Sequence, residues 1–110
     1  MPMPRRLLPL ATLAGLALAA GAARAQGTVP SVRITNRSPA AITGIFVSSA
    51  GVNTWGPDRL GDRTLAPDAS HTVTLPAGQC VNDVRVIHEG GRAEERRRVN
   101  LCSVSDLVFP

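Results

Sequence analysis

The sequence predicts an all-β fold: a small antiparallel β-sandwich or barrel of about six strands, stapled by one disulfide. Three observations predict this class. Short runs of β-branched or alternating residues recur through residues 31–109, separated by Gly, Pro, Asn and Asp turn signals. No segment after residue 25 has the apolar spacing of an amphipathic helix. The two cysteines, Cys80 and Cys102, flank a predicted hairpin.

Residues 1–25 have the three parts of a cleaved export signal. Arg5-Arg6 forms a positive start, residues 7–20 are apolar, and Ala23-Arg24-Ala25 is a small-x-small cleavage site. We therefore expect a signal peptide over 1–25 and one small β-domain over 26–110, periplasmic or secreted. A retained signal anchor is the alternative, but the apolar run is shorter than the ~20 residues of a spanning helix, so no membrane span is expected after cleavage. The paired arginines fit a general signal and a twin-arginine signal equally well.

The charge of the mature domain argues against nucleic acid as a partner. All 12 basic residues of the chain are arginines, against 8 acidic residues. Three of the arginines lie in the predicted signal, which leaves the mature domain a net charge of +1. The chain has one Trp, two Phe and no Tyr. Such a domain has neither the basic surface nor the aromatic platforms that nucleic acids require.

Two strands are expected before the long loop. Residues 31–36 alternate apolar and polar, as in a half-buried strand. Residues 36–39 form a turn, because Asn and Ser bond their own backbone and Pro interrupts the strand. Residues 41–48 form the second strand. Its apolar run at 45–47 predicts burial on both faces, and Gly44 is the expected place of a bulge.

Residues 51–69 form the longest irregular segment, the usual place for function in a compact domain. It holds the only tryptophan, Trp55, followed by Asp58 and Arg59. In one interpretation Trp55 covers the core while Asp58 and Arg59 pair or bond backbone amides. In the other, the three residues form a binding patch, since Trp and Arg are common interface anchors. The aspartates of this loop lack the spacing of a calcium loop, so no metal site is expected.

A third strand, a hairpin and a terminal strand follow. Residues 71–75 alternate cleanly. The β-branched run at 84–88 and its return at 96–101 enclose Gly90-Gly91, which supplies the positive φ values of a two-residue turn. Residues 107–109 make the last strand.

A two-residue turn places Cys80 opposite Leu101, one position from Cys102. A bulge or a three-residue turn would place the two cysteines directly opposite each other. Cysteines in an exported chain usually pair, so we expect a Cys80–Cys102 disulfide worth roughly 3 kcal/mol. Two free thiols with a redox or metal role are the alternative, although the chain has no C-x-x-C motif.

The same register places charges across the hairpin. Asp83 faces Arg98, Arg85 faces Arg96, and Arg85 lies diagonal to both Glu94 and Arg98. Cross-strand pairs of this kind contribute ~0.2–1 kcal/mol. We interpret Asp83, Arg85, Glu94 and Arg98 as structural charge pairs on a solvated face.

Candidates for catalysis are few. His71 follows a turn, and His88 adjoins the Gly90-Gly91 turn, where we expect it to be solvated. Neither lies in a catalytic motif such as G-x-S-x-G or H-E-x-x-H. We expect no catalytic residue and no cofactor. A small enzyme that uses His71 or His88 with an aspartate is the alternative.

Several short motifs follow one another in a fixed order: Asn36-x-Ser38, Trp55-Gly56-x-Asp58-x-Leu60-Gly61, Cys80-x-x-Asp83-x-Arg85 and Asn100-Leu101-Cys102. Through them the chain resembles a family of small exported bacterial β-domains of uncharacterised function, of an alphaproteobacterial type. The resemblance covers most of residues 32–109. It implies a β-rich exported domain and brings no activity or catalytic residue. Asp68 stands where that family's turn has Gly.

The leading hypothesis is a non-catalytic binding module. Its contact face is the Trp55 loop, with Asp58 and Arg59 as polar anchors and an envelope protein as partner. A structural envelope protein that pairs through an exposed edge strand is a third hypothesis. The sequence sets no oligomeric state.

Overall fold

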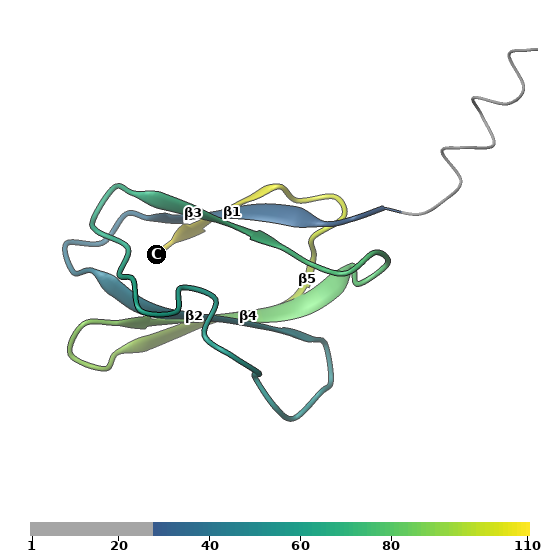
Figure 1. The fold of residues 1–110 in the computed structure, drawn as a ribbon, viewed down its shortest axis with the longest axis horizontal. Helices are drawn as coiled ribbons and strands as arrows, with labels where there is room; N and C mark the ends of the chain where they lie inside the picture. Colours follow the sequence, from purple (N-terminus) through teal and green to yellow (C-terminus); the bar gives the residue numbers. More distant parts are fainter. Residues whose placement is uncertain (1–27) are drawn as a thin grey trace, which may run out of the picture.

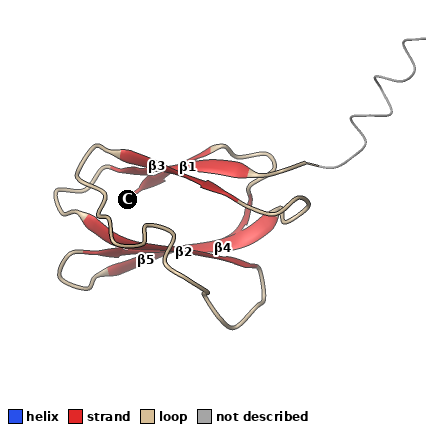
Figure 2. Cartoon of the chain, viewed as in Figure 1, coloured by secondary structure: helices blue, strands red, loops and turns tan. Residues whose placement is uncertain are grey.

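The structure is a computed structural model that describes residues 28–110. The predicted signal peptide, residues 1–25, lies outside the described residues. The described chain forms six strands in two three-stranded sheets that lie face to face (Figure 1). The predicted all-β, disulfide-stapled fold is confirmed. Over the described range every regular element is a strand (Figure 2), so no helix there could cross a membrane.

One sheet has the order β3-β1-β6. It is built from β1 (Ser31–Asn36), β3 (Ser70–Thr74) and β6 (Asp106–Phe109). β3 pairs with β1 in the antiparallel direction, whereas β6 runs parallel to β1. This parallel pair departs from the predicted antiparallel fold. It arises because the chain crosses from the second sheet after β5 and returns alongside β1.

The second sheet has the order β2-β4-β5 and is antiparallel throughout. It is built from β2 (Ile42–Ser49), β4 (Val81–His88) and β5 (Ala93–Asn100). Gly44 lies at a register shift in β2, so the predicted bulge is confirmed. A Cβ at Gly44 would lie 2.9 Å from the Phe46 ring. Phe46 itself is half-buried, so the prediction that both faces of residues 45–47 are buried was wrong.

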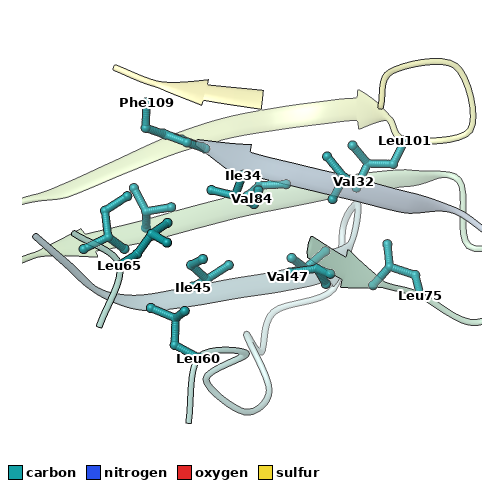
Figure 3. Packing of buried hydrophobic residues seen from close by; sticks show 13 residues of the cluster. Val32, Ile34, Ile45, Val47, Leu60, Leu65, Leu75, Val84, Leu101 and Phe109 are labelled. Atoms are coloured by element: carbon teal, nitrogen blue, oxygen red, sulfur yellow. The ribbon is translucent and has the colours of Figure 1, made fainter. Parts of the chain in front are cut away.

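The core lies between the sheets and takes alternate residues from the facing strands (Figure 3). Ile34 from β1 packs in the same cluster as Ile45 from β2 and Val84 from β4. Phe109, near the end of the chain, is fully buried. The cluster is completed by residues from strands and connections alike: Val32, Ile42, Val47, Leu60, Leu65, Val73, Leu75, Val86 and Leu101.

The connection between β2 and β3 crosses from one sheet to the other (Figure 1). Its second half is anchored, because Leu60 and Leu65 are buried in the core. Leu65 also exchanges two backbone hydrogen bonds with Ile42, at 2.8 and 2.9 Å. The segment is therefore fixed against β2 over its later residues.

The β4–β5 hairpin has a three-residue turn, Glu89 to Gly91, closed by a 2.8 Å hydrogen bond from the His88 amide to the Arg92 carbonyl. The predicted two-residue turn was wrong, and the register near the turn is shifted by one. Arg85 pairs with Glu95, not with Arg96. The predicted alignment of Arg85 with Arg96 was therefore wrong.

A bulge further along β5 reverses this shift. The register changes between Asn82 and Val84, where Arg98 adopts a positive φ of 55°. Beyond the bulge, Val81 pairs with Asn100, and the Leu101 amide donates to the Cys80 carbonyl at 2.7 Å. The predicted alignment of Cys80 with Leu101 is thus confirmed, although it is reached through two compensating shifts.

The predicted Cys80–Cys102 disulfide is confirmed, with the two Cα atoms 5.0 Å apart. A turn after β5 places Cys102 beside Cys80. The Asn100 side chain accepts a 3.0 Å hydrogen bond from the Cys102 amide, and the Asn100 carbonyl accepts one of 3.1 Å from Ser103. A disulfide of this kind indicates an oxidising, non-cytoplasmic environment.

Candidate functional site

Trp55 is half-buried and lies against two arginines of the β2-β4-β5 sheet. The guanidinium carbons of Arg85 on β4 and Arg97 on β5 lie 5.9 and 5.4 Å from the centroid of its ring. Arg85 alternates with the core residues Val84 and Val86, so it points away from the core. Trp55 therefore covers the outer face of this sheet. Each cation–π contact contributes about 0.5–1 kcal/mol at such a site.

The two arginines are held by carboxylates. Glu95 accepts a 2.6 Å hydrogen bond from Arg97 Nη2 and lies 3.5 Å from Arg85 Nη1. Arg97 Nη1 donates to Asp83 Oδ2 at 3.1 Å. Both ends of the Arg97 fork are thus occupied, and the guanidinium is fixed in place beside Trp55.

Asp83 is buried at the β5 bulge. Its Oδ1 accepts a 2.9 Å hydrogen bond from the Arg98 amide. This backbone bond lowers the pKa of Asp83. Burial acts in the opposite direction and the charge of Arg97 in the same direction, so that the pKa of Asp83 lies below its ordinary value. Asp83 thus interacts with the main chain of Arg98 and the side chain of Arg97. The predicted side-chain pair of Asp83 with Arg98 is not formed.

A cleft of about 330 Å³ adjoins the Trp55 cluster and shares Arg97 with it. Asp83 and Arg98 line one part, and the start of the long connection lines the rest, through Gly51, Val52 and Asn53. Val52 is 50% exposed. The Arg98 side chain is exposed and forms no ion pair with residues 28–110. The cleft therefore offers both an apolar group and a cation to solvent.

Asp58 and Arg59, predicted with Trp55 as a binding patch, lie elsewhere. Asp58 Oδ1 accepts hydrogen bonds from the amides of Ile45, at 3.0 Å, and Leu60, at 2.9 Å. The Arg59 amide donates to the Ile45 carbonyl at 2.7 Å, and Arg59 Nε is buried. Both residues thus attach the connection to β2. The structure gathers Arg85 and Arg97 around Trp55 in their place.

Replacing Asp58 with Ala should lower the free energy of unfolding by about 1.5–3 kcal/mol, because two amides lose a charged acceptor. Asp58→Asn keeps an oxygen in the same place and should lose less. Urea unfolding of the two variants measures the difference. If Asp58→Ala were as stable as the wild type, the anchoring role would be refuted.

His88 is only 1% exposed, so the expectation of a solvated position was wrong. It is enclosed because the β1–β2 connection folds over it: Ser38 Oγ lies 3.2 Å from His88 Nδ1. Glu94 Oε2 lies 3.0 Å from Nε2 on the other side. His71 is half-buried and pairs with Ile34 in the other sheet.

Ser38, His88 and Glu94 have the composition of a catalytic triad. Ser38 is buried, however, and its hydroxyl lies 2.7 Å from Asn36 Oδ1 and 2.8 Å from the Ala40 carbonyl, so its proton is already engaged. The cleft described above is lined by other residues. The arrangement cannot present a nucleophile to a substrate. Within residues 28–110 no cluster of His, Cys, Asp or Glu could hold a metal ion.

The fold and site define a β-sandwich with one disulfide and a tryptophan that lies over two arginines on one outer face. No protein-family model matches the chain, and no curated protein or solved structure matches it either. The functional interpretation therefore depends on the geometry of the site itself.

Proposed function

We propose that the protein is an exported, non-catalytic binding module, periplasmic or secreted, of the bacterial family that its motifs resemble. Its contact surface is the Trp55 face, which we define as Trp55, Arg85 and Arg97 together with the cleft residues Val52 and Arg98. The observation that carries the proposal is the position of Trp55, which lies against two guanidinium groups on the outside of the sandwich. Trp and Arg are the side chains most enriched among interface anchors.

Three side chains of the Trp55 face, Trp55, Arg85 and Arg97, are ordered before any partner arrives. Asp83 and Glu95 hold Arg97, and Arg85 and Arg97 hold Trp55. Ordering a long side chain on binding costs about 0.5–1.5 kcal/mol, and prior ordering removes this cost. Val81, on the outer side of β4, adds a further apolar group that is 45% exposed. A rigid aromatic and apolar surface with a free cation suits a protein partner.

The β5 edge offers less support for the alternative of a structural protein that pairs through an edge strand. β5 carries the bulge at Arg98, and its inward positions hold Glu94 and Arg96 in place of apolar residues. Bulges and inward-pointing charges are the features that protect sheet edges from pairing with another chain.

Site-specific photo-crosslinking tests the proposal. A crosslinking amino acid at Asn53, exposed in the cleft, should trap a partner in the envelope of the native organism, with the product identified by mass spectrometry. The same amino acid at Thr72, exposed on β3 of the opposite sheet, is the matched control and should give no such product. Equal products from both positions would contradict the assignment of the face.

Two variants then test the anchors. Trp55→Ala and Arg98→Ala should each abolish the Asn53 crosslink while the protein stays folded by thermal unfolding. Arg63→Ala, an exposed arginine of the same connection, should leave it intact. A folded Trp55→Ala protein that keeps the full crosslink would refute the proposed role of Trp55.

A further inference from the structure

β3 lies at the end of the sheet order β3-β1-β6 and pairs with β1 alone (Figure 1). Two hydrogen bonds just beyond its ends show which way its backbone groups point. The Asn36 amide donates to the Ala69 carbonyl at 3.0 Å, and the Leu75 amide donates to the Pro30 carbonyl at 2.9 Å. In an antiparallel pair, residues whose backbone groups face the neighbouring strand alternate with residues whose groups face away. The odd-numbered residues of β3 therefore bond β1.

The other residues of β3, Ser70, Thr72 and Thr74, turn their amides and carbonyls away from the sheet. Their side chains are exposed, and no hydrogen bond from elsewhere in residues 28–110 reaches these backbone groups. The bonds of β1 agree with this alternation, because Arg33, opposite Thr72, donates its amide to the Ser105 carbonyl on the far side, at 2.8 Å. Within the described chain, the outer side of β3 thus has three open donors and three open acceptors.

The edges of the other outer strands are covered or protected over part of their length. The connection between β2 and β3 bonds Ile42 and Ile45 at the edge of β2. β5 has the bulge and the charges described above, and at the edge of β6 the Arg96 side chain donates to the Val108 carbonyl at 2.9 Å. β3 has a regular register with β1 and no Lys, Arg, Asp, Glu or Pro among its five residues. It lacks the features that protect edges from pairing.

We propose that two copies of this domain pair edge to edge through β3, in the antiparallel direction and with Thr72 on the two-fold axis. Thr72 then faces Thr72 of the second copy, and Ser70 faces Thr74 of the second copy. Each of these residues points its backbone groups outward, so every facing pair exchanges two backbone hydrogen bonds. The open groups of both copies are all bonded in the dimer. This interface is separate from the proposed Trp55 face.

The side chains of β3 suit a second copy because the strand is complementary to itself about Thr72. The facing pairs on the exposed side combine Ser with Thr or Thr with Thr, which are favourable cross-strand pairs. No charges of the same sign meet along the strand. Beyond its ends, Asp68 faces Pro76 of the second copy. Arg33, the charged residue opposite Thr72 on β1, is already paired with Asp106 at 2.9 Å.

The symmetry of this interface limits the assembly to two copies. A two-fold contact uses the same surface on both chains and therefore closes on itself. Trp55 lies on the outer face of the other sheet, so both copies keep their contact faces exposed. A dimer with two contact faces binds a partner with two sites more tightly than a single domain does.

Sedimentation equilibrium of the purified protein tests the dimer. An interface of one short strand pair belongs to the weak, transient class. The average mass should therefore rise from one chain toward two chains between about 10 µM and 1 mM protein. A protein that is still monomeric at the upper concentration would overturn the proposal.

Three substitutions at Thr72 test the two-fold axis. Thr72→Pro removes the central outward amide, which the domain itself does not use, and Thr72→Lys places two positive charges opposite each other. Each should raise the dissociation constant by about tenfold or more. Thr72→Val keeps the amide and the branched shape, so it should dimerise as the wild type does. Thr72→Lys provides the folded variant if Thr72→Pro does not fold.

Two results with these variants would contradict the proposal. One is a folded Thr72→Pro or Thr72→Lys protein that dimerises as the wild type does. The other is a Thr72→Val protein that loses the dimer to the same extent as Thr72→Pro.

Hydrogen exchange measured by NMR locates the interface. The amides of Ser70, Thr72 and Thr74 should exchange more slowly at high protein concentration than at low concentration. The amides of His71 and Val73 bond β1 and serve as the control, because they should be protected at both concentrations. Outward amides whose exchange does not depend on concentration would overturn the proposal.

Photo-crosslinking separates this dimer from the proposed contact face. The crosslinking amino acid at Thr72 should trap a second copy, in a product with twice the mass of the chain. The partner product expected at Asn53 has a different composition and does not require the dimer. A failure of the Asn53 crosslink would therefore count against the Trp55 face alone, and the absence of the doubled product at Thr72 would count against the dimer alone.

Discussion

Replacing Phe109 with Ala is expected to lower the free energy of unfolding by about 3–5 kcal/mol, the range found for large aromatic residues removed from a core. Phe109 is fully buried, yet it belongs to the four-residue strand β6 near the end of the chain. The Arg96 guanidinium lies 4.2 Å from the centroid of its ring and donates to the Val108 carbonyl at 2.9 Å. The ring thus attaches β6 to the core and contacts a residue of the opposite sheet.

The matched control is Phe46→Ala, the same substitution at the other phenylalanine. Phe46 is half-buried on β2, so its removal leaves less of a cavity and should cost clearly less. Urea denaturation of both variants measures the two losses. The slope of the free energy of unfolding against urea concentration is compared with that of the wild type. Equal losses would show that β6 is not part of the cooperative core.

Removing the disulfide in Cys80→Ser/Cys102→Ser should cost about 3 kcal/mol, because the bond closes a loop with a sequence separation of 22. The bond also holds the crossing from β5 to β6 at its start. In a domain this small, such a loss is a large part of the total stability.

Reductant provides the control for this prediction. Reductant should lower the midpoint of the wild-type unfolding transition to that of the double variant, and it should leave the midpoint of the double variant unchanged. A wild-type midpoint that does not respond to reductant under unfolding conditions would contradict the stabilising role of the bond.

The strands could be predicted from the sequence because apolar and polar residues alternate along them. Residues 31–36 were predicted with the bounds that the structure has, and the bulge at Gly44 and the disulfide were also predicted. The hairpin register could not be predicted in the same way. Gly90-Gly91 suits a two-residue or a three-residue turn, and a difference of one residue exchanges every partner between the turn and the bulge at Arg98.

The site was predicted in part. The loop with Trp55 was identified, because a single tryptophan in a long connection is a strong signal. Its neighbours, Arg85 and Arg97, come from strands at least 30 residues away, and which arginines lie under the ring depends on the turn length and the bulge. The burial of His88 was missed for a similar reason, since Ser38 reaches it from a connection 50 residues away in the chain.

The long connection divides into two parts with different consequences for the molecule. Its later residues lie along the free edge of β2. The Asp58 side chain accepts from the Ile45 amide, the Arg59 amide donates to the Ile45 carbonyl, and Leu65 bonds both backbone groups of Ile42. This segment therefore satisfies backbone groups that a neighbouring strand would otherwise bond. An edge whose hydrogen-bonding groups are already used by its own chain cannot template the growth of a sheet between molecules. Because the later residues cover that edge, a substitution among the earlier residues, which carry Trp55, does not expose it.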